Sequence, residues 1–414
     1  MTQVEPVPRS RSVPGSRLLP LGPAFVASVA YVDPGNIATN TSAGAHHGYL
    51  LLWVVVAANL VAVLVQYLAA KLGLVTGESL PQLLGRRLPG PARLAYWAQA
   101  EAVVMATDVA EVIGGAVALH LLFDLPLVWG GLVTGLVSTA LLLVRDRRGQ
   151  RAFEHLVLSF LAVVTVGFAA GLVLEPPPAA AVSGLAPAFD GTDSVLLGAG
   201  ILGATVMPHA VHLHSALARD RHGPLREHPR RHLLLRTTRW DVGLSMLMAG
   251  GVNAAMLLVA AGNLGGLPDT DTLAGAHAAV TSSLGAAVGA LFAVAVLGSG
   301  LVSTSVGCHA GAVVMEGLLR RPVPLLPRRL LTLVPAVLLL ASGADPTWCL
   351  VVSQVLLSFG IPFALVPLAV LTSRRSVMGA DVNGAATAVA AFAATGTVVT
   401  LNGVLLWLIA TGRG

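Results

Sequence analysis

Four consecutive residues in the first long apolar segment, Asp33, Pro34, Gly35 and Asn36, differ from what a membrane-spanning helix normally contains. Proline has no backbone N–H and clashes with the preceding helical turn, and glycine adds backbone freedom, so the helix is predicted to break here. The flanking side chains provide a carboxylate and an amide oxygen at the break. Oxygen ligands of this kind suit a divalent cation or Na⁺.

A second apolar segment is interrupted in its middle at "GATVMPHAVHLHS", residues 203–215, where Pro208 follows Met207. The backbone carbonyls just before the two breaks, at Ala30 and Ala204, would lose their helical partners and could complete a cation site. A thioether sulfur makes such a site softer and favours Mn²⁺, Fe²⁺ or later transition metals over Mg²⁺ and Ca²⁺. Because a carboxylate near the bilayer centre is costly, Asp33 is predicted to be functional.

Three acidic residues lie in the third apolar segment, at Glu101, Asp108 and Glu111. Their spacings of seven and three place all of them on one stripe of a helix. Chains of buried carboxylates are typical of proton relays in pumps and transporters. We expect Arg221 and Arg329 to act as counter-ions, although a topology signal would also explain both residues.

Three histidines follow the second break, at positions 209, 212 and 214. Their spacing is a weak indication of a zinc site, because no carboxylate or cysteine accompanies them. Since histidine titrates near neutral pH, proton handling is the better functional interpretation for His209 and His214. We interpret His212 as the lining of a polar cavity.

The composition predicts an integral membrane protein. The 414 residues are 55% hydrophobic and only 11% charged, whereas soluble domains carry about 25% charged residues. Apolar stretches of roughly 20 residues, long enough to cross a bilayer, recur along the chain. We predict an all-α polytopic protein with eleven transmembrane helices. A single transporter domain spans 18–414, with helices 1–5 over about 18–174, helices 6–10 over about 191–372 and helix 11 over about 385–411.

The basic residues indicate the orientation. When the eleven segments are threaded through a membrane, 24 of the 25 lysine and arginine residues fall in alternate loops and so on one side, and only Arg413 falls on the other. The positive-inside rule therefore predicts a cell-membrane protein with residues 1–17 as a cytoplasmic tail and an extracytoplasmic C-terminus. The net charge of +5 is then a topology signal, and no nucleic-acid partner is expected.

The two interrupted segments are the first and the sixth, so each opens a set of five. Because five is odd, the second set would be inverted in the membrane relative to the first. Gly- or Pro-interrupted helices at matching positions of two inverted halves are the sequence feature that best indicates the binding site of a secondary transporter. We therefore expect the two breaks to face each other.

The motifs "DPGN" (33–36) and "MPH" (207–209) resemble the signatures of the Nramp (natural resistance-associated macrophage protein) family. Members of that family are proton-coupled divalent metal transporters, and bacterial members import Mn²⁺. The likeness continues through "ATDVAEVIG" (106–114), "AGAVVMEGLL" (310–319) and "SQVLLSFGIPFALVPL" (353–368), and it covers nearly the whole chain after the tail.

The resemblance implies a leucine-transporter-like fold with a 5+5 inverted repeat and broken helices 1 and 6. It implies a metal site formed by the side chains of Asp33, Asn36 and Met207 and the backbone carbonyls of Ala30 and Ala204. It adds one further ligand, Gln354 on helix 10. It also implies a proton pathway and supporting network that include these residues: Asp33, Glu101, Asp108, Glu111, His209, His214, Arg221 and Arg329.

The chain departs from the family pattern at three positions. Ala210 replaces an Asn, His212 replaces a Tyr, and Gly360 stands where a Gln is common. Related magnesium transporters lack the helix-6 methionine, so its presence at position 207 favours transition metals. The metal-ligand set is intact, and the departures concern the vestibule and gating.

The main hypothesis is a secondary transporter that imports Mn²⁺, and Fe²⁺ as well, together with protons. It is not an enzyme and has no resident cofactor, since the metal is cargo. Three alternatives stay open: a sodium-coupled amino-acid symporter of the same fold, a membrane-embedded metalloenzyme using the three histidines, and a channel. An anionic substrate group would not suit the break at Asp33, the metalloenzyme lacks a HExxH-like base, and no filter motif indicates a channel.

Overall fold

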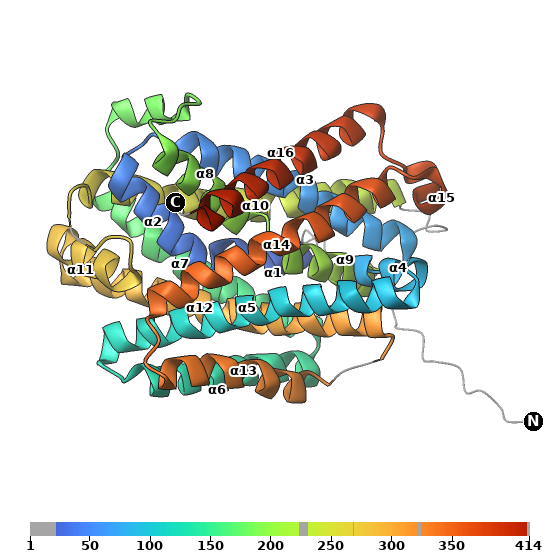
Figure 1. Cartoon of the computed structure of the whole chain (residues 1–414), viewed down its shortest axis with the longest axis horizontal. Coiled ribbons are helices and arrows are strands. Elements are labelled where there is room, and N and C mark those ends of the chain that lie inside the picture. The colour runs from blue at the N-terminus through green and yellow to red at the C-terminus, as the bar shows by residue number, and fades with distance from the viewer. Residues whose placement is uncertain (1–21, 223–230, 268, 322–323, 412–414) are drawn as a thin grey trace, which may run out of the picture.

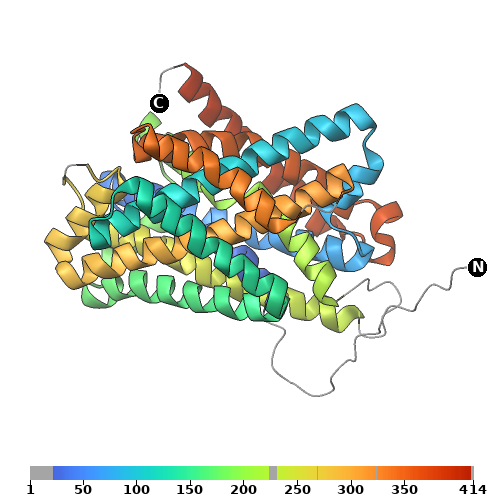
Figure 2. The ribbon, with the colours of Figure 1, turned by 90° about the horizontal axis from the view of Figure 1, so that it is seen from below.

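The computed structural model describes residues 22–222, 231–267, 269–321 and 324–411, and in these ranges every regular element is a helix. The predicted tail, 1–17, lies outside them. Figure 1 shows a bundle of long helices that run roughly along one axis, and Figure 2 shows the same bundle turned by 90°.

Nine helical segments in the described ranges are long and apolar enough to cross a membrane, with α8 and α9 together forming one of them. Their helices are α3 (Leu52–Thr76), α5 (Gly90–Phe123), α6 (Leu127–Arg148), α7 (Gln150–Leu174), α8 (Thr192–Thr205), α9 (Pro208–His222), α10 (Arg231–Asn263), α12 (Ala286–Leu319), α14 (Pro346–Thr372) and α16 (Ala385–Ala410).

Shorter helices complete the bundle and its connections. They are α1 (Pro23–Val29), η1 (Ala30–Val32), α2 (Pro34–His47), α4 (Leu80–Arg87), η2 (Ala179–Leu185), α11 (Leu273–Leu284), α13 (Leu325–Ala341), α15 (Arg375–Met378) and η3 (Gly379–Asp381). The interrupted α1–α2 segment and the 17-residue α13 would bring the spans to eleven. That number stays a prediction.

The first break is a change of backbone conformation at Asp33. A 3₁₀ turn precedes it, Asp33 is extended with φ −83° and ψ 169°, and α2 begins at Pro34. The carboxylate of Asp33 accepts a hydrogen bond of 2.7 Å from the backbone N–H of Asn36. Asp33 is therefore the N-cap of α2, and Pro34 occupies the first helical position, where its missing N–H costs nothing.

The second break separates α8 from α9. Helix α8 ends at Thr205, Val206 adopts φ −96° and ψ 75°, and α9 begins at Pro208. Proline again occupies the first position of the new helix. Both interruptions predicted from the proline motifs therefore occur where the sequence indicates them.

The interrupted segments lie in the interior of the bundle. Every residue of α1 is buried, and α2 packs against α10, α8 and α5. Helix α5 approaches the first break closely at Gly114, where a Cβ atom would overlap the ring of Pro34. At one edge of the bundle, α6 and α13 lie side by side next to α5 and α12 (Figure 1).

Candidate metal and proton site

The two breaks are joined directly by the side chain of Asn36. Its Nδ2 donates to the Asp33 carboxylate at 2.8 Å and to the backbone carbonyl of Ala204 at 3.0 Å. The Ala204 carbonyl, which the second break frees, thus accepts a hydrogen bond from a side chain of the first break, 168 positions away in the sequence. The side-chain oxygen of Asn36 is buried and has no hydrogen-bond partner among the described residues, which leaves an acceptor free for a cation.

Gln354 of α14 lies against the first break. A Cβ atom on Gly35 would overlap the Gln354 side-chain amide, and it would lie 3.3 Å from Oδ2 of Asp33. Glycine at position 35 is therefore needed for this close approach. The structure brings together Asp33, Asn36, Gln354 and the Ala204 carbonyl.

Ala30 and Met207 are the remaining members of the expected ligand set. Both are fully buried, and both belong to the same apolar cluster at the centre of the molecule. Met207 directly precedes α9, and Ala30 begins the 3₁₀ turn before Asp33. Each therefore lies beside one of the breaks, as the sequence motifs require.

Two of the three acids on α5 are held by consecutive arginines of α13. Arg329 Nη1 donates to both carboxylate oxygens of Asp108 at 2.6 Å, and Arg328 Nη2 donates to Glu101 at 2.7 Å. Arg329 also donates to Ser138 of α6 at 2.7 Å. Both Arg329 and Asp108 are completely buried, and removing one partner of such a pair would leave an uncompensated charge.

The third acid, Glu111, is also fully buried. It lies against α12 at Gly307, where a Cβ atom would be 3.1 Å from the Glu111 carboxylate. No arginine forms an ion pair with Glu111 in the described part of the chain. Of the three acids it is therefore the one free to change its protonation without breaking an ion pair.

Arg221 does not contact the α5 acids, and the expectation that it is their counter-ion is wrong. It forms an ion pair with Glu154 of α7. Arg221 lies in the last turn of α9, which reaches the end of the bundle where α7 begins. The arginine that sequence reasoning missed is Arg328, whose only signal was its position beside Arg329 at the start of an apolar helix.

The three histidines of α9 are buried and have different neighbours. His214 Nδ1 lies 2.7 Å from the Gln66 side chain, and Gln66 donates to the Tyr31 hydroxyl at 2.6 Å. His209 and His212 line a small pocket together. No group of three or more His, Cys, Asp or Glu in the described ranges is arranged to hold a metal, so the histidines do not form the site that a metalloenzyme would need.

Comparison with known proteins identifies the family. Residues 24–408 match the family model described as Nramp, natural resistance-associated macrophage protein-like. This chain belongs to the Nramp family. The family expectation from the two motifs is confirmed.

Relatives of this Nramp chain include the divalent metal cation transporter MntH of Mycobacterium tuberculosis strain H37Rv, which is 61% identical over 393 residues, 95% of this chain and 92% of the relative. A crystal structure of the Eremococcus coleocola manganese transporter, in complex with an aromatic bis-isothiourea compound, has a TM-score of 0.87 and 31% identity. That match covers 96% of this chain and 89% of the other.

A more distant likeness concerns the fold alone. The structure of MhsT in complex with L-phenylalanine has a TM-score of 0.59 at 14% identity, covering 94% of this chain and 98% of that one. MhsT has the leucine-transporter fold. The Nramp chain is therefore a multi-pass, all-helical membrane protein of this fold class, as predicted.

The structure gives a physical reason for one departure from the family motifs. Gly360 of α14 faces the second break, where a Cβ atom would lie 3.1 Å from Pro208 and 2.8 Å from Val103. The small residue lets α14 pack directly against the start of α9. His212 lines the pocket that Gly360 borders, and Ala210 is fully buried in the central apolar cluster.

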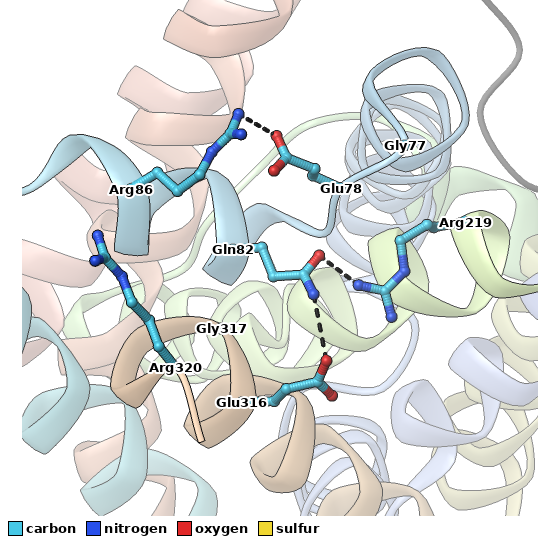
Figure 3. Close-up of a pocket in the computed structure, with 8 residues that line it drawn as sticks. All are labelled: Gly77, Glu78, Gln82, Arg86, Arg219, Glu316, Gly317 and Arg320. Atoms are coloured by element: carbon cyan, nitrogen blue, oxygen red, sulfur yellow. Dashed lines mark hydrogen bonds and ion pairs between the residues drawn. The ribbon is translucent and has the colours of Figure 1, made fainter. Parts of the chain in front are cut away.

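At the arginine-rich end of the bundle the Nramp chain has a pocket of about 960 Å³, drawn in Figure 3. Gln82 of α4 is bound on both sides there: its oxygen accepts from Arg219 of α9, and its nitrogen donates to Glu316 of α12 at 3.3 Å. Arg86 pairs with Glu78 at 2.5 Å. None of the expected metal or proton residues lines this pocket.

At the same end, an acid anchors the start of α1. The Asp241 carboxylate of α10 accepts hydrogen bonds of 3.2 Å from the backbone N–H groups of Gly22 and Ala24. The first N–H groups of a helix have no partners within it, and a carboxylate there is stabilised by the helix dipole. Sequence reasoning missed Asp241, because its partners are 217 and 219 positions away.

Proposed function

We propose that this protein imports divalent transition-metal ions, Mn²⁺ first and Fe²⁺ as well, across the cell membrane together with protons by alternating access. The observation that carries the proposal is the junction of the two breaks. Asp33, Asn36, Gln354 and the Ala204 carbonyl come together in the interior, and the amide oxygen of Asn36 has no hydrogen-bond partner within the described ranges. Relatives named divalent metal cation transporter and manganese transporter support the same function.

The proposed metal ligands are the side chains of Asp33, Asn36, Met207 and Gln354, with the carbonyls of Ala30 and Ala204. Only Asp33 carries a negative charge, so it dominates the affinity for a cation. Met207 adds a sulfur, which favours transition metals over Ca²⁺ and Mg²⁺. The Ala204 carbonyl accepts one hydrogen bond from Asn36 in this conformation, and its second lone pair is available for a cation.

The coupling of metal transport to protons follows from the same chemistry. A carboxylate must lose its proton to bind a metal, so metal binding at Asp33 releases a proton whenever the residue was protonated. The proposed pathway for it comprises the α5 acids, two histidines and the arginine that holds Asp108: Glu101, Asp108, Glu111, His209, His214 and Arg329. Glu111 is the best acceptor among the acids, because the other two are held by arginines.

The proposed orientation places the arginine-rich end in the cytoplasm and residues 1–17 on the same side. Alternating access then requires the cytoplasmic and extracytoplasmic ends of the interrupted helices to open in turn. At the cytoplasmic end, Asp241 and its two backbone hydrogen bonds hold the start of α1. Opening on that side would release this contact.

Uptake by proteoliposomes tests the proposed function. Mn²⁺ uptake should accumulate metal, acidify the lumen in proportion, and increase when the outside is made acidic. Fe²⁺ should compete strongly, while Ca²⁺ and Mg²⁺ should compete weakly. Metal uptake that moves no protons would contradict the symport, and L-amino-acid uptake that needs no metal would support a sodium-coupled amino-acid symporter of the same fold instead.

A further inference from the structure

Two histidines end α2, at the extremity of the bundle opposite the arginine-rich loops. His46 Nε2 lies 2.6 Å from Asp271, in the segment before α11. His47 lies between two aspartates from the segment that begins α8: its Nδ1 is 3.1 Å from Asp190 and its Nε2 is 3.2 Å from Asp193. These contacts join α2 to segments 143 to 225 positions away.

Both ring nitrogens of His47 lie within hydrogen-bond distance of a carboxylate oxygen. A neutral imidazole has one donor and one acceptor nitrogen, whereas a carboxylate only accepts hydrogen bonds. Because both ring nitrogens of His47 face carboxylates, both contacts are hydrogen bonds only when the ring is a doubly protonated imidazolium. A neutral His47 would direct a lone pair at one of the aspartates.

We propose that His47, whose side chain is 10% exposed and lies between carboxylates that are 53% and 72% exposed, is a proton-binding site at the extracytoplasmic surface. Its protonation fastens α2 to the start of α8 and closes that side of the transporter. We call the contacts of His46 and His47 with Asp190, Asp193 and Asp271 the His–Asp latch. The proposal rests on the orientation and proton coupling of the proposed function. It assigns a role to residues outside the metal site and the α5 acids.

The ion-pair partners of the latch aspartates are its two histidines. None of the three aspartates has a Lys or Arg ion partner among the described residues. The hydrogen bond from His47 lowers the pKa of Asp190, so this carboxylate stays ionised to a lower pH than a free aspartate. Ser42 donates a hydrogen bond of 3.0 Å to Asp271.

The geometry suits a proton better than a metal. Asp190 and Asp193 lie at opposite nitrogens of the same ring, so they cannot bind one ion together with that ring. The sign of the effect follows from the contacts. A closed state that holds the imidazolium between carboxylates binds the proton more tightly than an open one, so acid stabilises closure and the effect disappears as pH rises through the histidine range.

Hydrogen exchange on the full-length protein in lipid nanodiscs tests the latch. Protection of the backbone amides around 44–49, 190–195 and 269–275, corrected for the intrinsic pH dependence of exchange, should be roughly two- to fivefold greater at about pH 5.5 than at about pH 8, because exposed ion pairs contribute modestly. His47→Gln should remove this dependence at 190–195, and Asp193→Asn, at a side chain that is 72% exposed, should reduce it there. The segment 269–275 should keep the part that comes from His46 and Asp271.

The matched control is His120→Gln. His120 lies 3.9 Å from Asp124 at the end of α5, outside the latch, so this variant should keep the full pH dependence. Equal protection at both pH values in the unmodified protein would overturn the proposal, as would an unchanged dependence in His47→Gln. The readout needs no transport: pH-dependent protection in a protein that fails to take up Mn²⁺ supports the latch and contradicts only the proposed function.

Discussion

The two breaks are built from the same proline-led start of a helix, but they satisfy their backbones differently. At the first break the chain uses its own side chains, since Asp33 caps α2 and Asn36 binds Asp33. The second break has apolar Val206 and Met207 before Pro208, and its Ala204 carbonyl depends on Asn36. The first break therefore provides the charged and polar side chains for both, while the second adds a backbone carbonyl and a sulfur.

The largest effect should come from the charge of Asp33. Asparagine is as good an N-cap as aspartate, so Asp33→Asn should keep α2 intact and remove only the negative charge. We expect Mn²⁺ uptake to fall by about a hundredfold or more, with little change in the melting temperature. Asp124→Asn, at a side chain that is 99% exposed, is the control. Uptake retained by Asp33→Asn would place the charge for the metal elsewhere.

The second largest effect should be the difference between glycine substitutions at the two breaks. Gly35→Ala places a methyl group on the Gln354 amide, whereas Gly203→Ala in α8 meets only Ser358 Oγ at an ordinary 3.4 Å. Overpacking costs about 1–3 kcal/mol, so Gly35→Ala should lower uptake about tenfold and Gly203→Ala should hardly change it. Adding Gln354→Ala to Gly35→Ala should restore folding stability in calorimetry. If Gly35→Ala and Gly203→Ala lower uptake equally, close packing does not distinguish the two breaks.

The sulfur should determine selectivity more than rate. Met207→Leu keeps the volume and removes the thioether, so Ca²⁺ should compete with Mn²⁺ about tenfold better, measured as the inhibition of Mn²⁺ uptake. Met246→Leu, at another fully buried methionine, controls for the change in packing. If Ca²⁺ competes equally in both variants, the sulfur does not contact the metal.

The prolines should matter least. Both occupy the first position of a helix, where a missing N–H costs nothing, and replacing them mainly increases the entropy of the unfolded chain. Pro34→Ala and Pro208→Ala should each lower the free energy of unfolding by about 0.4–1 kcal/mol and keep uptake within about threefold. A complete loss in either variant would show that proline itself, and not the polar contacts, maintains that break.

The sequence predicted the positions of both breaks and the buried acids because local chemistry determines them. "DPGN" and "MPH" favour the start of a new helix, because proline suits the first helical position, and acids seven and three positions apart share a helical face. The partners of these groups were harder to predict. Arg328 with Glu101, Asp241 with the start of α1, and Gln66 with His214 are separated by 148 to 227 positions. Such pairs depend on how helices pack, and no local pattern determines that.

Arg221 is another residue whose partner could not be predicted from the sequence. Its type and its place at the end of a helix were correctly interpreted as those of an ion-pair partner, but Glu154, and not an α5 acid, is the carboxylate that it meets. The sequence contains several acidic residues that could have been the ion-pair partner of Arg221. Only the packing of α9 beside the start of α7 decides between them.

The paired arginines of α13 determine the register of two helices. Arg328 and Arg329 are neighbours, yet they bind acids seven residues apart on α5, a separation of roughly 10 Å along that helix. A slide of α5 past α13 by one turn, about 5.4 Å, would break both buried pairs at once. We therefore expect the two helices to stay together as one rigid unit during transport. The first break packs against α5 where Pro34 meets Gly114, so the proposed metal site lies at the edge of this unit, and the interrupted helices are expected to move past it.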